Sequence, residues 1–370
     1  MPRDVYIVDA VRTPIGRGKP GGALHRFHPV ELLARTLTAV VERARLPKHE
    51  VEDVIAGCVT PIGEQGMCVG RMAALHAGFP IEVPGLQLNR FCGSGQQAIH
   101  SAAQAIAAGD IDIAIAGGVE SMSRVAIGSD AGPAPGDFPY QLLHQGVSAE
   151  MMAERWSLTR DALDEYAARS HCLASAARPH TRAELIPTDG LEGDEGVRAD
   201  VDRARMAALA PVFKPGGVIT AANSSQISDG AAAVLLASGE KAEALGLRKR
   251  ARIVARVAVG SDPELMLSGP IPATRLALAK SGLTLADMDA IEINEAFASV
   301  VLAWAKQLDA PLDRVNRQGG AIAHGHPLGA TGAVLMTKLV NILERTGGRY
   351  GLQTMCIGLG MATATIIERV

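Results

Sequence analysis

The sequence predicts a layered α/β fold built from two related halves. Short apolar segments alternate with amphipathic helical segments through residues 1–118, and this alternation is typical of layered α/β proteins. The order of loop, helix and strand recurs roughly 230 residues later, which indicates an internal repeat. The chain has 370 residues, 48% of them hydrophobic, so two or three packed units are expected rather than one simple core.

The first half is expected over residues 1–118 and is completed by about 227–250. Short apolar runs predict strands at 5–8, 54–59, 86–90 and 111–116. Helical periodicity predicts a helix over 29–44, with Pro29 near its start, and another over 67–76. A third helix follows the turn at 91–95 and ends at Ala108, before Gly109 and Asp110.

The middle of the chain differs, and residues 119–226 are expected to form an inserted, loop-rich lobe. Its loops are predicted at 128–136 and 189–196, and its helices around 149–156 and 160–178. The second half is expected over 251–370. It has predicted strands at 290–293, 353–357 and 362–367, and a helix over 329–343 that Gly347 and Gly348 end.

Composition and charge exclude several classes of function. The formal net charge of −3 gives no reason to expect a nucleic acid partner. No apolar run approaches the length that spans a bilayer, and the start lacks the layout of a signal peptide. The cysteines are five in number and widely spaced (58, 68, 92, 172 and 356). A disulfide framework is therefore not expected, and a cytoplasmic location fits better.

Cys92 is the first candidate for chemistry because it lies where a strand becomes a helix. Gly93 and Gly95 permit a sharp turn and the close approach of a ligand to the backbone. The positive end of a helix lowers the pKa of a thiol, and the thiolate is the nucleophilic form. The alternative is a small buried cysteine with no chemical role.

Two further segments combine glycine with reactive side chains. Cys356 begins the run Cys-Ile-Gly-Leu-Gly-Met, and Gly358 leaves backbone amides accessible. His324 and His326 could form a metal site, but no Cys, Asp or Glu lies nearby in sequence to complete it. A histidine at the mouth of a helix can instead act as a base or hydrogen-bond donor, or be an ordinary loop residue.

Asn294 follows the predicted strand 290–293, at the end where α/β folds place ligand groups. Its alternative role is to cap the next helix. Two thiols, a histidine and an amide on glycine-rich strand ends suit acyl-thioester chemistry. One thiolate can hold an acyl group, a second base can take a proton beside a thioester carbonyl, and the donors can stabilise oxyanions.

With these residues in place, the sequence resembles the thiolase family over essentially its whole length. The matching blocks follow the family's order: 8–16, 89–97, 117–123, 230–235, 294–298, 319–332 and 356–361. The cysteine block, the Asn-Glu-Ala-Phe block and the Gly-His-Pro block are specific in combination. The resemblance implies a thiolase-like α/β/α/β/α layering with an inserted loop lobe.

The resemblance also implies a role for each matching residue. Cys92 would be the acylated nucleophile, and His326 would activate it and help to bind an oxyanion. Cys356 would be the acid/base at the α-carbon. Asn294 would hold a water in the first oxyanion hole, and the amides of Cys92 and Gly358 would form the second. His324 is not a catalytic position of the family and is expected to be a loop residue.

The implied reaction is the CoA-dependent cleavage of 3-ketoacyl-CoA, or the reverse condensation, with coenzyme A as substrate or product and no permanently bound cofactor or metal. The implied contacts to coenzyme A are Ser225, His144, Arg198, Phe213, Ala296 and Phe297. Arg198 could equally be a solvated surface charge. Three departures from the family, Gln145, Ala222 and Leu359, could alter the substrate preference.

Two other classes stay open at this point. A decarboxylating ketoacyl synthase has a related layout but generally a single catalytic cysteine, so Cys356 argues against it. A catalytically silent lipid-binding relative would not be expected to retain all four catalytic residues. The resemblance implies a homodimer, with a homotetramer as the alternative, because the segment 123–144 is short for a tetramer-forming loop.

Overall fold

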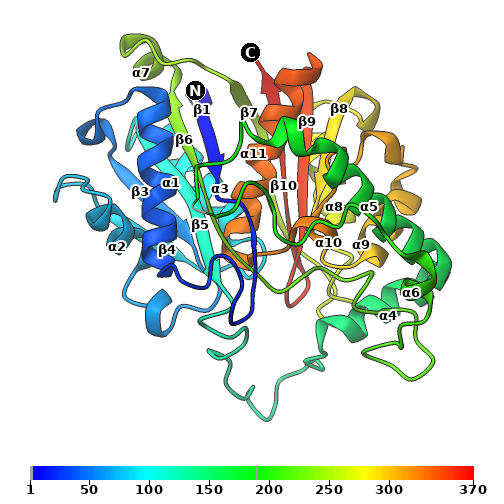
Figure 1. Ribbon diagram of the computed structural model, residues 1–370. Helices are drawn as coiled ribbons and strands as arrows, with labels where there is room; N and C mark the ends of the chain where they lie inside the picture. Colours follow the sequence, from blue (N-terminus) through cyan, green and yellow to red (C-terminus); the bar gives the residue numbers. More distant parts are fainter. Residues whose placement is uncertain (1–2, 189) are drawn as a thin grey trace.

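The computed structural model describes residues 3–188 and 190–370 (Figure 1). Met1 and Pro2 of the expected first half, and Asp189 of the expected loop 189–196, lie outside the described residues. The strands are β1 Val5–Arg12, β2 Gly16–Arg17, β3 Asp53–Gly57, β4 Gly85–Leu88, β5 Ile113–Ser121, β6 Ser228–Ser238, β7 Ala251–Gly260, β8 Met288–Ile293, β9 Tyr350–Ile357 and β10 Met361–Arg369. The α-helices are α1 Pro29–Ala44, α2 Val69–His76, α3 Ser94–Ala108, α4 Gln145–Arg155, α5 Arg160–Thr181, α6 Arg203–Ala207, α7 Gly239–Ala244, α8 Pro270–Ser281, α9 Ala298–Leu308, α10 Ala321–His324 and α11 Leu328–Thr346.

The sheet order shows that the two halves share one topology. The path runs β4-β3-β5-β6-β1-β7-β10-β9-β8, with β2 beside β6. In the first half β3 is parallel to β4 and β5, and β6 is antiparallel to β5 and β1. In the second half β9 is parallel to β8, and β10 is antiparallel to β9 and β7. The predicted repeat is confirmed, and the halves meet where β1 pairs briefly with β7.

Three large apolar cores lie between the five layers of the molecule. Helices α1 and α2 cover the outer face of the first half, and α8 and α9 cover that of the second. Helices α3 and α11 pack against each other between the two halves, and both lie near the centre of Figure 1. The α/β/α/β/α layering is therefore confirmed. It positions the N-terminal ends of α3 and α11 next to each other.

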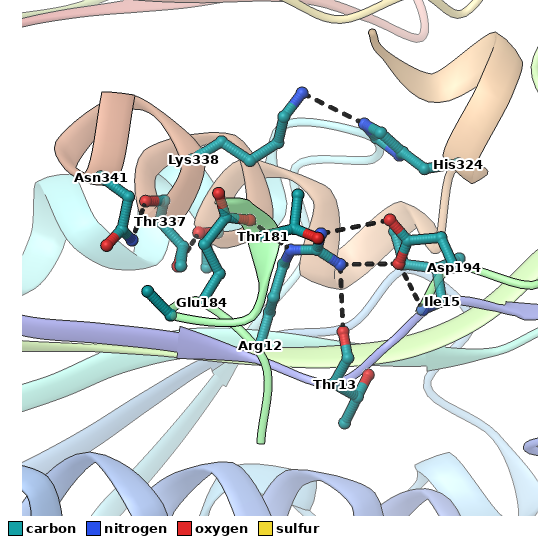
Figure 2. A network of polar contacts seen from close by, with 12 residues as sticks. Arg12, Thr13, Ile15, Thr181, Glu184, Asp194, His324, Thr337, Lys338 and Asn341 are labelled. Carbon is teal, nitrogen blue, oxygen red and sulfur yellow. Dashed lines mark hydrogen bonds and ion pairs between the residues drawn. The ribbon is translucent and has the colours of Figure 1, made fainter. Parts of the chain in front are cut away.

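The inserted lobe packs mainly on the second half, through contacts of α4 and α5 with α9. A buried arginine of the first half also forms ion pairs with the inserted lobe (Figure 2). Arg12 of β1 is fully buried, and its guanidinium contacts Glu184 at 3.0 Å and Asp194 at 2.7 Å. Burial opposes the charge on Arg12, but the two carboxylates outweigh burial and raise its pKa. The lobe is thus anchored to both halves.

Several element boundaries differ from the expectation for local reasons. Met67 and Cys68 have positive φ angles of 53° and 58°, so α2 begins only at Val69. Strand β5 runs on to Ser121, past the expected boundary at residue 118, because Glu120 and Ser121 pair with β6. Helix α4 begins at Gln145, since His144 caps it by accepting from the amide of Gly146. No helix within 3–188 or 190–370 is both long and apolar enough to cross a membrane.

Candidate active site

Cys92 occupies a tight turn between β4 and α3. Phe91 has a positive φ of 44°, and the Ser94 hydroxyl donates to the Phe91 carbonyl at 2.6 Å and accepts from the Arg90 amide at 2.9 Å. These contacts hold the turn so that Cys92 lies two residues before the first residue of α3, buried to 3% exposure. A non-glycine residue at positive φ is strained and is often found at functional sites.

Two backbone amides point at the Cys92 sulfur. Burial raises the pKa of the Cys92 thiol to about 12, and hydrogen bonds from the amides of Cys92 itself and of Gly358 act in the opposite direction. The structure thus brings Gly358, at the end of β9, next to Cys92, as expected. Paired amides of this kind can also bind an oxyanion that forms at an acyl group on the sulfur.

His326 lies two residues before α11, and its contacts define its tautomer. The Thr331 hydroxyl donates to the Pro327 carbonyl at 2.9 Å, so it accepts from His326 Nδ1 at 2.6 Å. Nε2 therefore carries the lone pair, and it faces the Asn294 side-chain nitrogen at 3.2 Å. Burial lowers the pKa of His326 to about 4. The ring is thus neutral, with its acceptor nitrogen turned towards the site.

Asn294 and Cys356 complete the group. Asn294 directly follows β8, and the N-cap of α9 is Phe297, so the capping role considered for Asn294 is wrong. Burial and the nearby Cys92 raise the pKa of Cys356, while hydrogen bonds from the Asn294 side chain and the Ala296 amide oppose the rise. Among the described residues, no group contacts the buried Asn294 Oδ1. That oxygen is available to a water or ligand.

The surroundings of Cys92 are apolar. It shares a small core with side chains from the loops after β3 and β5, from α11 and from β9: Val59, Met122, Leu328, Leu335 and Met355. The expected catalytic residues Cys92, His326, Cys356, Asn294 and Gly358 are thus neighbours, linked by the contacts above. Burial of this kind strengthens the electrostatic interactions between the groups.

A metal site at His324 and His326 does not fit the geometry. Both nitrogens of His326 are engaged by Asn294 and Thr331. His324 is the last residue of α10 and is buried, so it is not the loop residue that was expected. Within the described part of the chain, no three His, Cys, Asp or Glu side chains cluster as metal ligands would.

Most of the expected coenzyme A contacts form a second group, which adjoins Asn294 through Ala296 and Phe297. The ring of His144 stacks on Phe213 with centroids 5.0 Å apart, and Phe213 meets the edge of Phe297 at 6.0 Å. The amide of Ser225 donates to the carbonyl of Ala296 at 2.9 Å. An aromatic row therefore leads from the exposed His144 to the residues that adjoin Asn294.

Arg198 is exposed and lines a cavity of about 640 Å³. The inner wall includes Gln226, whose carbonyl accepts from the amide of His326 at 3.2 Å. Two arginines that sequence reasoning missed, Arg17 and Arg205, line the same cavity. The signal that could have found Arg205 is the recurrence of arginine at 203 and 205, close to Arg198 in the sequence.

Sequence reasoning also missed two residues that hold the catalytic segments. Thr331 lies in the matching block 319–332 but was not singled out, although it sets the tautomer of His326. The buried carboxylate of Glu120 accepts from the amides of Val59, Thr60 and Gly329. It therefore joins the loop after β3 to the start of α11.

The three residues that depart from the family pattern, Gln145, Ala222 and Leu359, lie in different parts of the structure. Ala222 lines the cavity that contains Arg198. Gln145 is the first residue of α4, next to His144. Leu359 lies at the β9–β10 turn with a positive φ of 59° and is 42% exposed. A leucine is strained at this φ, whereas a glycine is not.

Comparison with known proteins identifies the family. Models of the thiolase N-terminal and C-terminal domains match residues 5–240 and 247–369. The steroid 3-ketoacyl-CoA thiolase FadA6 of Mycobacterium tuberculosis is 48% identical, covering 99% of this chain and 94% of that protein. A 3-ketoacyl-CoA thiolase of Vibrio cholerae is 45% identical, covering 99% of each. The crystal structure of the Bacillus anthracis acetyl-CoA acetyltransferase superposes with a TM-score of 0.92 at 37% identity, covering 100% of this chain and 99% of that one. With two domain models, full-length relatives and a shared fold all in agreement, the chain belongs to the thiolase family.

Proposed function

We propose that this acyltransferase cleaves 3-ketoacyl-CoA with coenzyme A, giving acetyl-CoA or propionyl-CoA and a shortened acyl-CoA, and runs the reverse condensation. The observation that carries the proposal is the pair of buried thiols, Cys92 and Cys356, beside the neutral imidazole of His326. A ketoacyl synthase would not need the second thiol, and a silent lipid-binding relative would need neither.

The first step would transfer the acyl group to the enzyme. The Cys92 thiol gives its proton to His326 Nε2 as its sulfur attacks the 3-keto carbonyl. The C2–C3 bond then breaks, the acyl group stays on Cys92, and the enolate takes a proton from Cys356. Because burial keeps the pKa of Cys92 high and that of His326 low, the proton moves only as the sulfur attacks.

The second step would release the product. The Cys356 thiolate takes the proton of the incoming coenzyme A thiol, whose sulfur attacks the acyl group on Cys92. The Cys92 thiolate leaves and recovers its proton from His326, so every group returns to its starting state. Asn294, with a water on its unpartnered Oδ1, and the amides of Cys92 and Gly358 would stabilise the oxyanions of the two steps.

Coenzyme A would bind across the inserted lobe. Its phosphates suit the cavity of Arg198, because the three arginines that line it, Arg17, Arg198 and Arg205, outnumber its two aspartates, Asp200 and Asp202. Its pantetheine arm suits the aromatic row of His144, Phe213 and Phe297, beside Ser225 and Ala296. Coenzyme A is then a substrate, and no permanently bound cofactor is required.

A homodimer is the proposed assembly, with a homotetramer as the alternative. Strand β4 ends the sheet, and large apolar side chains are exposed on and near it, including Met67 at 85%, Ile81 at 77% and Leu86 at 46%. An unpaired strand edge with exposed apolar side chains is a template for pairing with a second copy. A cytoplasmic location is supported by the cysteines, since all five are free.

A split phenotype of the two cysteines tests the mechanism. Cys356→Ala should still be acylated at Cys92 and should still exchange label between acetyl-CoA and free coenzyme A, but should lose cleavage and condensation by several orders of magnitude. Cys92→Ala should lose all of these reactions, and a mass spectrum after acid quench should then find no acyl adduct. If Cys356→Ala depresses exchange as strongly as cleavage, Cys356 is not a dedicated base at the α-carbon. A series of 3-ketoacyl-CoA chain lengths would identify the preferred substrate.

A further inference from the structure

A buried charged cluster lies directly behind His326, and the proposed reaction does not use it. Its centre is Lys338 of α11, whose side chain is 1% exposed. The ammonium group donates to Glu292 Oε2 at 2.8 Å and to the Gly319 carbonyl at 2.6 Å, and it contacts His324 Nε2 at 3.3 Å. Figure 2 shows Lys338 and His324 pointing towards each other. All three ammonium hydrogens therefore have partners.

His324 connects Lys338 to the loop of Gly325, His326 and Pro327, here called the catalytic loop. Its Nε2 faces a group that can only donate, so Nε2 accepts and Nδ1 carries the proton. Nδ1 then donates to the Gly325 carbonyl at 3.0 Å. Gly325 has a φ of 107°, and a Cβ there would lie 2.2 Å from the Ser228 hydroxyl. His324 thus holds the unusual peptide that directly precedes His326.

Glu292 connects Lys338 to the strand that precedes Asn294. It lies in β8, two residues before Asn294, and side chains two apart along a strand point to the same face. Asn294 in turn contacts His326 Nε2 at 3.2 Å. The contacts therefore form a closed ring that runs from β8 through α11 and α10 to the catalytic loop and back to β8.

We propose that Lys338 is a positioning residue for the active site. Its ammonium group holds His324 and Glu292, and so fixes the spacing between the catalytic loop and the end of β8. This inference rests on the roles proposed above for His326 and Asn294. A shift of about 1 Å between reacting groups can cost roughly a hundredfold in rate. We therefore expect these contacts of Lys338, here called the brace, to affect turnover rather than substrate binding.

The ring can be opened at Lys338 without leaving a buried charge. Lys338→Met alone would strand Glu292, which is destabilising in itself. The double variant Glu292→Gln, Lys338→Met removes both charges. We expect its kcat per acylatable Cys92 to fall about ten- to a hundredfold, with the KM for coenzyme A changed less than about threefold. Thr337→Val is the matched control, because its hydroxyl bonds only to Ala333 within the same helix.

A second pair of variants separates positioning from folding. His324→Leu removes both the donor to the Gly325 carbonyl and the acceptor for Lys338, and should lose turnover to a similar degree. His324→Asn keeps a donor near Nδ1 but no longer reaches Lys338, so it should remain slow as well. A purely structural role would lower the fraction of acylatable enzyme but leave kcat per site unchanged.

The proposal is overturned if His324→Leu keeps the kcat per site of Thr337→Val, and also if His324→Asn, which cannot contact Lys338, recovers that kcat. Should the double variant not fold, the His324 pair decides alone. His326→Ala is measured beside them. If it retains turnover, the proposed role of His326 is wrong, which is distinguishable from a failure of the brace.

Discussion

The substitution His100→Gln should make the stability of the protein less sensitive to acid. His100 lies in α3 with 2% exposure, and its Nε2 contacts the Thr365 hydroxyl at 2.7 Å. Burial, with smaller effects of Arg256 and Arg90, lowers its pKa from 6.5 to about 3. The folded state therefore keeps this ring neutral, whereas the unfolded chain protonates it near pH 6.5.

The sign and size of the effect follow from this difference. The unfolded state binds the extra proton, so stability is complete above pH 6.5 and falls as the pH drops towards 3. At about pH 5, some 1.5 units below the unfolded pKa, the loss is about 2 kcal/mol. Glutamine fills a similar space, can bond to Thr365 and does not titrate, so the variant should be spared this loss.

Urea unfolding followed by tryptophan fluorescence, at about pH 7.5 and pH 5, measures the effect. Other buried groups titrate as well, and some carboxylates have raised pKa values that act with the opposite sign. The informative quantity is therefore the difference between wild type and variant in the free energy lost between the two pH values. His49→Gln, at a side chain that is 71% exposed, is the control. If wild type and His100→Gln lose the same free energy within about 0.5 kcal/mol, the linkage argument is refuted.

Three further outcomes are expected. Asn294→Ala should lower kcat roughly a hundred- to a thousandfold with the fold intact, as when one preorganised oxyanion donor is removed; steady-state kinetics with a loss under about threefold would contradict this. Arg12→Met leaves Glu184 and Asp194 buried without their partner, so it should destabilise the protein by about 3–5 kcal/mol and lower Tm by about 4–6 °C; calorimetry showing no change would argue against the anchor. Leu86→Asp on the edge strand should shift the protein towards monomer in light scattering, and an unchanged oligomer would place the interface elsewhere.

Local signals were enough to predict the main parts of the site. The turn at Cys92 is followed directly by glycine and by the start of a helix, and the residues next to Cys92 in the sequence indicate both. The end of β8 likewise indicates Asn294, because α/β folds place polar ligand groups directly after such strands. The chemistry of these residues could therefore be predicted from the residues around them, and the family resemblance then gave each a role.

The supporting residues could not be predicted, because their partners are distant in the chain. Lys338 lies in a largely buried helix, and its partner Glu292 belongs to a strand in another layer. A lysine in a sequence is expected at the surface, yet this one is 1% exposed. Arg12 and Asp194 similarly join β1 to the inserted lobe. Only the packing of the layers brings such pairs together.

The repeat explains why Cys92 and His326, the proposed nucleophile and its base, lie in one site. Cys92 and His326 each lie two residues before one of the two central helices, and each follows a residue with positive φ, Phe91 at 44° and Gly325 at 107°. The two residues thus take equivalent places in the two halves. The distance between them depends on how closely α3 and α11 approach.

That approach requires glycine at the crossing of the central helices. A Cβ on Gly95 of α3 would lie 2.7 Å from the Gly329 carbonyl, and one on Gly332 of α11 would lie 2.0 Å from the Gln96 amide. The backbones are therefore in contact where larger side chains would hold them apart. Each half supplies one catalytic turn, and neither turn is an active site alone. The glycines between α3 and α11 take no part in the proposed chemistry themselves. They let the two helices approach, and this approach brings together the turns that carry Cys92 and His326.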